Sequence, residues 1–375
     1  MSKSVYVVAG EVSGDTHGAE LMEALAEEWV DVEFRGLGGS SMGEIAGDGV
    51  EDWVDDAAVV GVWEVLKKYR WFKDRFDRVV KAVLAWKPDV LLLVDYPGFN
   101  LRLAKEISEK LPETKIVHYV APQVWAWNQK RIPRIASTHD LMLCLFPFEV
   151  PIFEEAGLRS RCVGHPLVDE LEELRISAEP DERVIGLFPG SRRREVAILF
   201  PVMLEAAEIL WGRDPGLRFR AAAASKKVEV VMREALVASG LPEGLVELQL
   251  GGSQALMQSV GCGVVASGTA TLEAAYYGMP YCLVYQVAWP TYLMARQLVK
   301  LPHIGLINIL AGRELVTEFI QNDANSYELA SWLGEHLANT ELRSQLREEL
   351  LEAASRLGRT GVHCRAAREI SLLFE

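Results

Sequence analysis

Short apolar runs alternate with amphipathic helical patterns along most of the chain. The runs VYVVA (5–9), VLLLV (90–94) and VIGLF (184–188) have the length and composition of buried strands. Residues 102–111 and 194–210 place apolar side chains at helical spacing. Regular alternation of strands and helices is typical of parallel sheets with helices on both faces. The pattern therefore predicts an α/β fold.

A polar segment separates two series of strand–helix units. Residues 169–183 (DELEELRISAEPDER) are acidic and short of core residues, which is typical of a linker. We expect Rossmann-like domains over 1–168 and 184–325, facing each other, and a helical C-terminal segment over 326–375. Ligands of such sheets bind beyond the carboxyl ends of the strands, so we expect the site in the cleft between the domains.

The composition excludes several classes of protein. Of 375 residues, 50% are hydrophobic and 25% charged, which is typical of a folded globular chain. The formal net charge of −14 argues against a general nucleic-acid binder, because phosphate contacts need a basic face. The five cysteines form no CxxC pair, so we expect no metal site, no disulfide framework and a reducing cytoplasm. No run approaches the ~18 apolar residues of a membrane span.

The second series begins with GLFPGSRRREVAILF (186–200), a strand that runs through Gly190 and Ser191 into a helix. The first turn of a helix presents unpaired N–H groups, and Arg192 adds a guanidinium that matches phosphate oxygens. The alternative is a helix capped by Ser191 with solvated arginines. Arginines are unfavourable at the positive end of a helix, so an anionic ligand explains them better.

A similar turn occurs in VVASGTATLEAAYYGMP (264–280), where Ser267, Gly268 and Thr269 precede a helix. Glu273 lies one position beyond a capping-box glutamate, so it is free to accept hydrogen bonds from a ribose or sugar diol. An ordinary capped helix fits this pattern equally well. Two such helix starts in one domain suggest a nucleotide, although the Walker A pattern is missing and residues 10–18 do not match GxGxxG.

The first domain offers a carboxylate at the end of a strand. Asp95 follows the run 90–94 and precedes Tyr-Pro-Gly, which indicates a sharp turn. In one interpretation Asp95 caps that turn. In the other it is catalytic, because α/β proteins place their chemistry at the carboxyl edge of the sheet.

Residues 59–84 combine aromatic and basic side chains. Seven basic and three acidic residues give this segment a charge of +4, and amphipathic segments of this type bind anionic membrane surfaces. The alternative is a surface helix that packs on the sheet by its apolar stripe. The residues expected to contact the membrane are Trp63, Lys67, Lys68, Arg70, Trp71 and Phe72.

Eight motifs make the chain similar to a known family. They are AGEVSGD (9–15), DYPGFNLRLAK (95–105), HYVAPQVWAWNQKRI (118–132), LFPFE (145–149), GHPLVD (164–169), FPGSRRREV (188–196), ASGTATLEA (266–274) and NILAGRELV (308–316). In this order they resemble the lipid-A-disaccharide synthases, over nearly the whole chain. The resemblance implies a GT-B fold and an inverting glycosyltransferase that needs no metal and no cofactor.

The resemblance also implies the substrates. Members of that family transfer 2,3-diacylglucosamine from UDP to the 6-hydroxyl of 2,3-diacylglucosamine 1-phosphate, which yields the β-1,6-linked lipid A disaccharide 1-phosphate and UDP. We therefore expect both glycolipids as partners. We also expect a cytoplasmic enzyme that is peripheral on the inner face of the inner membrane, where it meets an anionic surface. A homodimer is left open.

The resemblance carries over to three groups of residues. The catalytic group is Asp95, with Glu11 and Asp15 as further acids. The acceptor and lipid group is Ser13, Trp63, Asn100 and Trp125, although Trp125 is at least as well explained by packing. The donor group is Gly190, Ser191, Arg192, Glu195, Ser267, Gly268, Thr269, Thr271, Glu273, Asn308, Gly312 and Arg313.

The chain departs from the family at Gly98, where many members carry a second aspartate in a pattern like DxPDFN. If that carboxylate is the base in those members, the base here is Asp95 or another acid such as Glu11 or Asp15. Two other functions stay open. One is another UDP-sugar enzyme of the same architecture, such as an epimerase or the peptidoglycan transferase. The other is a lipid or nucleotide binder that has lost its base.

Overall fold

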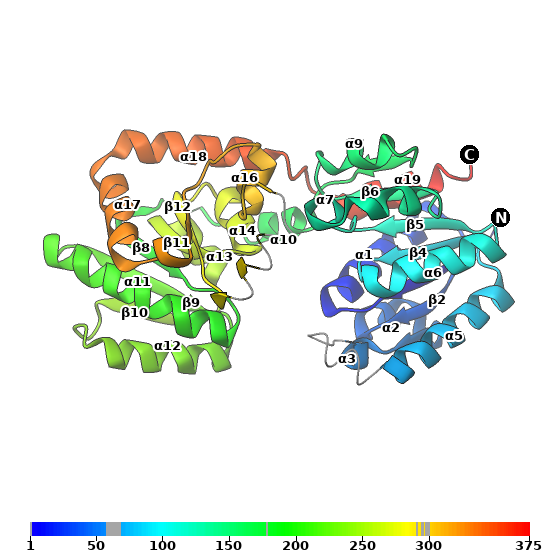
Figure 1. Ribbon diagram of the computed structural model, residues 1–375, viewed down its shortest axis with the longest axis horizontal. Coiled ribbons are helices and arrows are strands. Elements are labelled where there is room, and N and C mark those ends of the chain that lie inside the picture. The colour runs from blue at the N-terminus through cyan, green and yellow to red at the C-terminus, as the bar shows by residue number, and fades with distance from the viewer. Residues whose placement is uncertain (1, 58–68, 178, 290–291, 294–295, 297–300) are drawn as a thin grey trace. The chain divides into compact units, whose positions relative to one another are not determined.

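The computed structural model describes residues 2–57, 69–177, 179–289, 292–293, 296 and 301–375. The chain forms two compact units, which we call unit 1 (Met1–Pro166 with Gly358–Glu375) and unit 2 (Leu167–Leu357). Each unit is built on its own parallel sheet with helices on both faces (Figure 1). The predicted α/β fold with two Rossmann-like domains is confirmed.

Unit 1 contains a seven-stranded sheet in the order β3-β2-β1-β4-β5-β6-β7, and each strand pairs in parallel with its neighbours. All five residues of the central strand β4 are buried, because helices cover both faces of the sheet. The strands are β1 Lys3–Ala9, β2 Val32–Gly38, β3 Val50–Asp52, β4 Val90–Val94, β5 Lys115–Tyr119, β6 Leu141–Cys144 and β7 Ser160–Cys162.

The helices of unit 1 divide between the two faces of its sheet. Helices α1, α2 and α19 pack together, and α5 and α6 pack together on the opposite face (Figure 1). The helices are α1 Val12–Glu28, α2 Ser40–Ala46, α3 Val54–Ala57, α5 Tyr69–Trp86, α6 Pro97–Lys110, α7 Val124–Trp127, α8 Ile132–Ala136, α9 Glu149–Glu154 and α19 Val362–Ser371, with the 3₁₀ turns η1 Gly47–Gly49 and η2 Gln129–Arg131.

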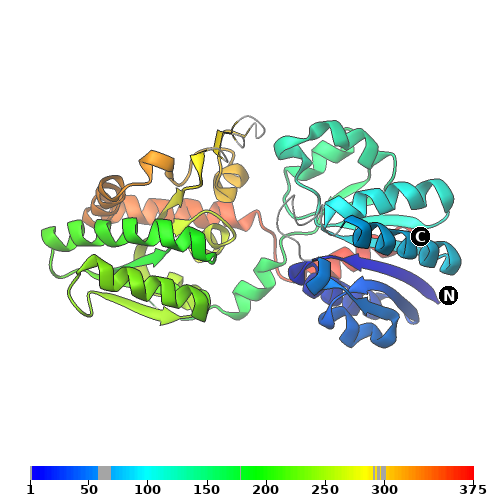
Figure 2. The same cartoon turned by 60° about the horizontal axis from the view of Figure 1, so that its bottom comes forward.

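Unit 2 contains a six-stranded parallel sheet in the order β10-β9-β8-β11-β12-β13. Its strands are β8 Asp181–Phe188, β9 Arg218–Ala223, β10 Val246–Leu250, β11 Val260–Ala266, β12 Tyr281–Tyr285 and β13 Glu318–Ile320. In Figure 2, α11 and α12 lie side by side along this unit, in agreement with their packing. The helices are α10 Leu167–Glu173, α11 Arg193–Arg213, α12 Lys226–Ser239, α13 Ser253–Ser259, α14 Ala270–Tyr276, α16 Leu306–Ala311, α17 Ser326–Ala338 and α18 Thr340–Ser355, with η3 Gln321–Asp323.

The boundaries of the units differ from those expected. Residues 169–183 are not a plain linker, because α10 belongs to unit 2 and β8 already begins at Asp181. Leu171 of α10 is fully buried, and its carbonyl oxygen accepts a hydrogen bond from Tyr277 Oη at 2.9 Å. The C-terminal segment is helical as expected, but it divides between the units: α17 and α18 pack on unit 2, and α19 returns to unit 1.

Among the described residues, no helix combines the length and the apolar character that a membrane crossing requires.

Candidate functional site

A cavity of about 320 Å³ opens at the carboxyl edge of the unit 2 sheet. Its walls come from the segments that follow β8, β9, β10 and β11, the edge where open α/β sheets bind ligands. We call it the donor pocket. It is lined by Phe188, Gly190, Ser191, Arg192, Glu195, Ala222, Ala223, Ala224, Gly251, Ser253, Met257, Ala266, Ser267, Gly268, Thr269, Ala270 and Glu273.

The N-terminus of α11 faces this pocket without a side-chain cap. Arg192, rather than Ser191, occupies the N-cap position, and its side chain makes no capping hydrogen bond. The alternative interpretation, in which Ser191 caps the helix, is therefore wrong. The first-turn N–H groups of this 21-residue helix and the exposed Arg192 leave the pocket suited to an anion.

Gly190 allows the turn before α11 to pass close to Glu195. Its φ is +102°, and a Cβ at this position would lie 2.6 Å from Glu195 Oε2. Glu195 is half-buried, and burial raises the pKa of its carboxyl group while the charge of Arg192 opposes that shift. Any side chain at residue 190 is therefore expected to displace Glu195 and narrow the pocket.

Glu273 is the second carboxylate of the donor pocket. Burial raises its pKa to about 6, with a smaller contribution from the charge of Glu170. Its Oε2 accepts a hydrogen bond from Gln254 Nε2 at 3.1 Å. Thr271 supports the same turn from below, because it is fully buried and its Oγ1 donates to the carbonyl oxygen of Gly268 at 2.7 Å.

Four of the predicted donor residues do not line this pocket: Thr271, which lies beneath the Gly268 turn, and three residues at or next to α16. Asn308 is fully buried, donates from Nδ2 to Val316 O and Glu318 Oε1 at 2.8 Å each, and accepts at Oδ1 from the N–H groups of Leu315 and Val316 at 2.8 and 2.9 Å. Gly312 ends α16 with φ +73°. Arg313 pairs with Glu349 at 2.6 Å. These residues thus make their contacts around α16 and α18, and their role in donor binding stays a prediction.

Helix α13 contributes residues that the sequence interpretation missed. Ser253 and Met257 line the pocket, and Gln254 binds Glu273. The signal that could have found them is Gly251-Gly252 after β10, since both glycines have positive φ and open a helix at the same sheet edge.

In unit 1, Asp95 lies immediately after β4. Asp95 and Tyr96 both adopt left-handed conformations, with φ of +45° and +48°. Burial raises the pKa of the Asp95 carboxyl, the charge of Glu11 adds to the shift, and the backbone N–H of Tyr96 and the charge of His17 oppose it. Tyr96, not Asp95, occupies the N-cap of α6. Asp95 is thus a half-buried carboxyl with a raised pKa at a strand's carboxyl edge.

The other predicted acids of unit 1, Asp15 and Glu11, differ in burial and in hydrogen bonding. Asp15 is buried, and its carboxylate accepts the backbone N–H groups of Gly39, Ser41 and Met42 at 2.6, 2.9 and 3.1 Å. These bonds hold the start of α2, which is a structural role. Glu11 is exposed at the N-cap of α1 and makes no capping hydrogen bond. Ser13 is exposed in the first turn of the same helix.

The predicted acceptor and lipid residues are mostly packed. Asn100 is fully buried, and its Nδ2 donates to the carbonyl oxygen of Asp95 at 2.8 Å. Trp125 is buried, and its Nε1 donates to Glu149 Oε1 at 3.0 Å. Trp125 is therefore packed in the core of unit 1, as the packing alternative expects. Burial raises the pKa of Glu149 to about 7.

The predicted membrane segment is only partly described. Trp63, Lys67 and Lys68 lie outside the described residues. Trp71 and Phe72 of α5 are half-buried and pack against the core, where Trp71 stacks on Trp53 with ring centroids 6.1 Å apart, as the surface-helix alternative expects. Arg70 is exposed at the start of α5.

The two sheets and the pocket at a sheet edge place this chain in the GT-B class of folds. It is similar to a putative UDP-N-acetylglucosamine 2-epimerase from Listeria monocytogenes (TM-score 0.65, 14% identity, 100% of this chain and 97% of that one). It is also similar to the calicheamicin glycosyltransferase CalG4 (TM-score 0.59, 14% identity, 99% and 98%).

The family model described as lipid-A-disaccharide synthetase matches residues 5–372, and the chain belongs to that family. It is 38% identical to the lipid-A-disaccharide synthase of Trichlorobacter lovleyi, over 100% of this chain and 98% of that protein. It is also 38% identical to the synthase of Geobacter metallireducens, over 98% of this chain and 96% of that protein.

Proposed function

We propose that this protein is a lipid-A-disaccharide synthase. It transfers 2,3-diacylglucosamine from UDP to the 6-hydroxyl of 2,3-diacylglucosamine 1-phosphate, with inversion at the anomeric carbon and without a metal. The observation that carries the proposal is membership of the family over residues 5–372. The donor pocket of unit 2 and the Asp95 carboxyl of unit 1 supply suitable chemistry.

In this proposal the donor pocket holds the UDP sugar. The uncapped N-terminus of α11 and the guanidinium of Arg192 bind the diphosphate, because both offset negative charge. The half-buried carboxylates of Glu195 and Glu273 accept hydrogen bonds from hydroxyl groups of the ribose and sugar. Solved structures of this fold support a UDP ligand, since one is an epimerase from Neisseria meningitidis bound to UDP-GlcNAc (TM-score 0.62, 12% identity).

Asp95 acts as the general base. Its carboxylate takes the proton of the acceptor 6-hydroxyl while that oxygen attacks the anomeric carbon, and the bond from that carbon to the diphosphate oxygen breaks with its electron pair leaving on UDP. A raised pKa makes the carboxylate a better base near neutral pH. Glu11 is the second candidate because it is exposed beside Asp95, whereas the Asp15 carboxylate is engaged by three backbone donors.

We further propose that the enzyme acts in the cytoplasm, as a peripheral protein on the inner face of the inner membrane. Both glycolipid substrates are amphiphiles that reside in a bilayer, so the enzyme has to meet an anionic surface. The charge of +4 over residues 59–84, with Arg70 exposed, supports this contact.

The test is a reaction of purified protein with the two glycolipids in the presence of EDTA, followed by mass spectrometry of the tetra-acyl disaccharide phosphate. We expect Asp95→Asn to lower kcat about 10²–10⁴-fold, because a positioned general base contributes that factor. Asp48→Asn, an exposed acid of η1, is the matched control and should keep full activity.

Full activity of Asp95→Asn would contradict Asp95 as the base and favour Glu11. Conversion of UDP-N-acetylglucosamine to its 2-epimer, with no disaccharide formed, would replace the transferase by an epimerase. Binding of UDP with neither product would leave a non-catalytic nucleotide binder.

A further inference from the structure

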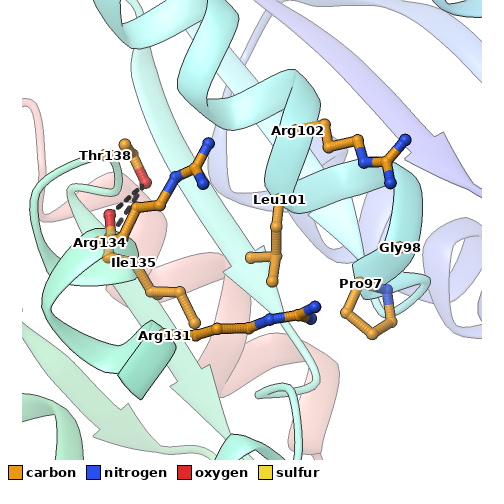
Figure 3. Close-up of a pocket in the computed structure, with 8 residues that line it drawn as sticks. All are labelled: Pro97, Gly98, Leu101, Arg102, Arg131, Arg134, Ile135 and Thr138. Carbon is orange, nitrogen blue, oxygen red and sulfur yellow. Dashed lines mark hydrogen bonds between the residues drawn. The ribbon is translucent and has the colours of Figure 1, made fainter. Parts of the chain in front are cut away.

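A second cavity, of about 280 Å³, lies in unit 1 and collects three arginines. Figure 3 shows Arg102 of α6 and Arg131 and Arg134 of the η2–α8 segment around Leu101. The side chain of Arg131 extends toward Pro97 and Gly98. We call this cavity the arginine pocket. It is lined by Pro97, Gly98, Leu101, Arg102, Arg131, Arg134, Ile135 and Thr138.

The arginine pocket adjoins the turn that carries Asp95. The chain runs from Asp95 through Tyr96 directly into Pro97 and Gly98, which form the first turn of α6 and part of the pocket wall. Arg102 follows four residues after Gly98 and so lies on the same face of α6. A ligand in this pocket therefore contacts the first turn of α6, which follows the proposed base directly in the chain.

The pocket has two guanidinium groups, those of Arg102 and Arg134, whose charge is not offset by an ion pair with a described carboxylate. Its lining includes three guanidinium groups and no carboxylate. Neither Arg102 nor Arg134 forms an ion pair with a carboxylate of the residues that the structure describes. Three like charges around one small cavity repel each other, and an anion bound among them relieves that repulsion. In a chain of net charge −14, such a cluster is unexpected for a surface without a ligand.

The shape and chemistry of the lining favour a phosphate monoester on an amphiphile. Guanidinium groups match phosphate oxygens through paired N–H donors. Leu101 and Ile135 add apolar surface between the arginines (Figure 3), which suits a ligand that is not a free inorganic ion. The diphosphate of the donor is already assigned to the pocket of unit 2.

We propose that the arginine pocket binds the phosphate group of the acceptor glycolipid and so selects a phosphorylated acceptor. This inference rests on the proposed function. The phosphate orients the acceptor sugar on the α6 side of the Asp95 turn, and Arg102 and Arg134 act as binding residues rather than as groups that take part in the proton transfer. An acceptor without phosphate loses these contacts and becomes a poor substrate.

The test measures kinetics of the full-length chain in mixed micelles with two acceptors, 2,3-diacylglucosamine 1-phosphate and the same glycolipid without phosphate. For Arg102→Gln combined with Arg134→Gln, we expect KM for the phosphorylated acceptor to rise about 10–100-fold, the range for lost hydrogen bonds to a charged group. KM for the UDP sugar and the slow turnover of the unphosphorylated acceptor should not change.

The matched control is Lys105→Gln, which removes a positive charge from an exposed position on the same helix, where Lys105 pairs with Glu109. It should leave all KM values unchanged. Binding of UDP by the arginine double variant reports only on unit 2, so an unchanged urea midpoint followed by tryptophan fluorescence shows that unit 1 is also folded.

The proposal would be overturned if KM rose equally for both acceptors. It would also be overturned if KM for the phosphorylated acceptor did not change. A loss of binding to anionic vesicles with unchanged KM would assign the arginines to membrane headgroups instead, and would also overturn it. If no acceptor is glycosylated at all, a ³¹P NMR titration with glucosamine 1-phosphate separates the two failures. If glucosamine 1-phosphate binds the parent protein but not the arginine double variant, the arginine pocket is supported while the proposed function fails. If it does not bind the parent protein, the pocket and the proposed function are both rejected.

Discussion

Asp95 and Tyr96 keep a backbone conformation that few non-glycine residues adopt, with φ of +45° and +48°. Such residues cost of order 1–3 kcal/mol each and persist only where their surroundings hold them. Here Asn100 Nδ2 donates to the carbonyl oxygens of Asp95, Val94 and Val8 at 2.8, 3.3 and 3.3 Å. Asn100 therefore positions the Asp95 turn through its side-chain amide.

Gly98 offers a direct test of the departure from the family pattern. A Cβ at this position meets no atom within 4 Å, so Gly98→Asp should fold. It should gain about 1 kcal/mol of stability, because a glycine leaves the first turn of α6 and an acid joins its positive end. We expect KM for the phosphorylated acceptor to rise, since the new carboxylate neutralises part of the arginine pocket. Urea unfolding and acceptor kinetics measure the two effects.

The same substitution decides whether a second carboxylate can serve as the base. We expect Asp95→Asn with Gly98→Asp to stay as inactive as Asp95→Asn alone. Recovered activity in the double variant would mean that position 98 can supply the base and that Asp95 is not uniquely placed for it.

At the scale of elements, α19 completes unit 1 although it lies about 190 residues beyond the rest of that unit in the chain. It packs on α1 and buries one face fully, through Val362, Ala366, Ala367 and Ile370. The stability of unit 1 therefore depends on a segment that follows unit 2 in the sequence.

Truncation of the buried face of α19 should destabilise unit 1. Ile370→Ala is expected to lower the free energy of unfolding by about 2–5 kcal/mol, as buried isoleucine-to-alanine changes do. Arg368→Ala, an exposed position on the same helix, should change it by less than about 0.5 kcal/mol. Chemical denaturation followed by tryptophan fluorescence measures both. Equal effects of the two variants would show that α19 does not dock in solution.

At the scale of the whole molecule, unit 1 carries most of the buried histidines. Burial lowers the pKa of His139 and of His165 to about 4 each, and it lowers the pKa of His118 well below its usual value. Repulsion from His139 adds to the shift of His118, and repulsion from His17 adds to that of His165.

These shifts predict that unit 1 loses stability in mild acid. Because the folded pKa lies below the unfolded value of about 6.5, the unfolded state takes up protons first as the pH falls. The stabilisation is present above pH 6.5 and is lost as the pH falls from 6.5 to about 4. The loss in free energy of unfolding is on the order of 3 kcal/mol for each histidine whose folded-state pKa is about 4. Urea unfolding between pH 7.5 and 5, with separate tryptophan probes for each unit, measures the effect. Unit 2 is the internal control, since a hydrogen bond between His336 and the carbonyl oxygen of Trp332 opposes the effect of burial on the pKa of His336, and equal losses of stability in both units would contradict the prediction.

The alternation of apolar runs and amphipathic helices was sufficient to predict both sheets, because strand and helix periodicity are local properties. The residues that line the donor pocket could be grouped from the sequence for the same reason. Gly190, Arg192, Ser267 and Glu273 each stand at a strand-to-helix turn, and such turns of one parallel sheet meet at a common edge. The short strands β3, β7 and β13 were not predicted, since three residues carry too little pattern. The outer strands β2 and β6 of unit 1 were not predicted either.

The roles of individual polar residues could not be derived from local pattern. Asp15 stands in a family motif, yet its hydrogen-bond partners Gly39 and Met42 lie outside that motif. Asn308 bonds to Val316 within its own motif, but the motif letters do not show that these two residues meet. The arginine pocket needs α6 and α8 to approach across about 30 residues, which no single window shows.

The sequence by itself determined the order of elements, the two parallel sheets and the family. Local side-chain patterns and ordered motifs encode these features directly. The tertiary structure alone decided that α19 completes unit 1, that Asp95 is half-buried while Asp15 is engaged, and that three arginines share one cavity. Burial, pKa and charge compensation depend on which distant segments surround a group, and that information exists only after the chain has folded.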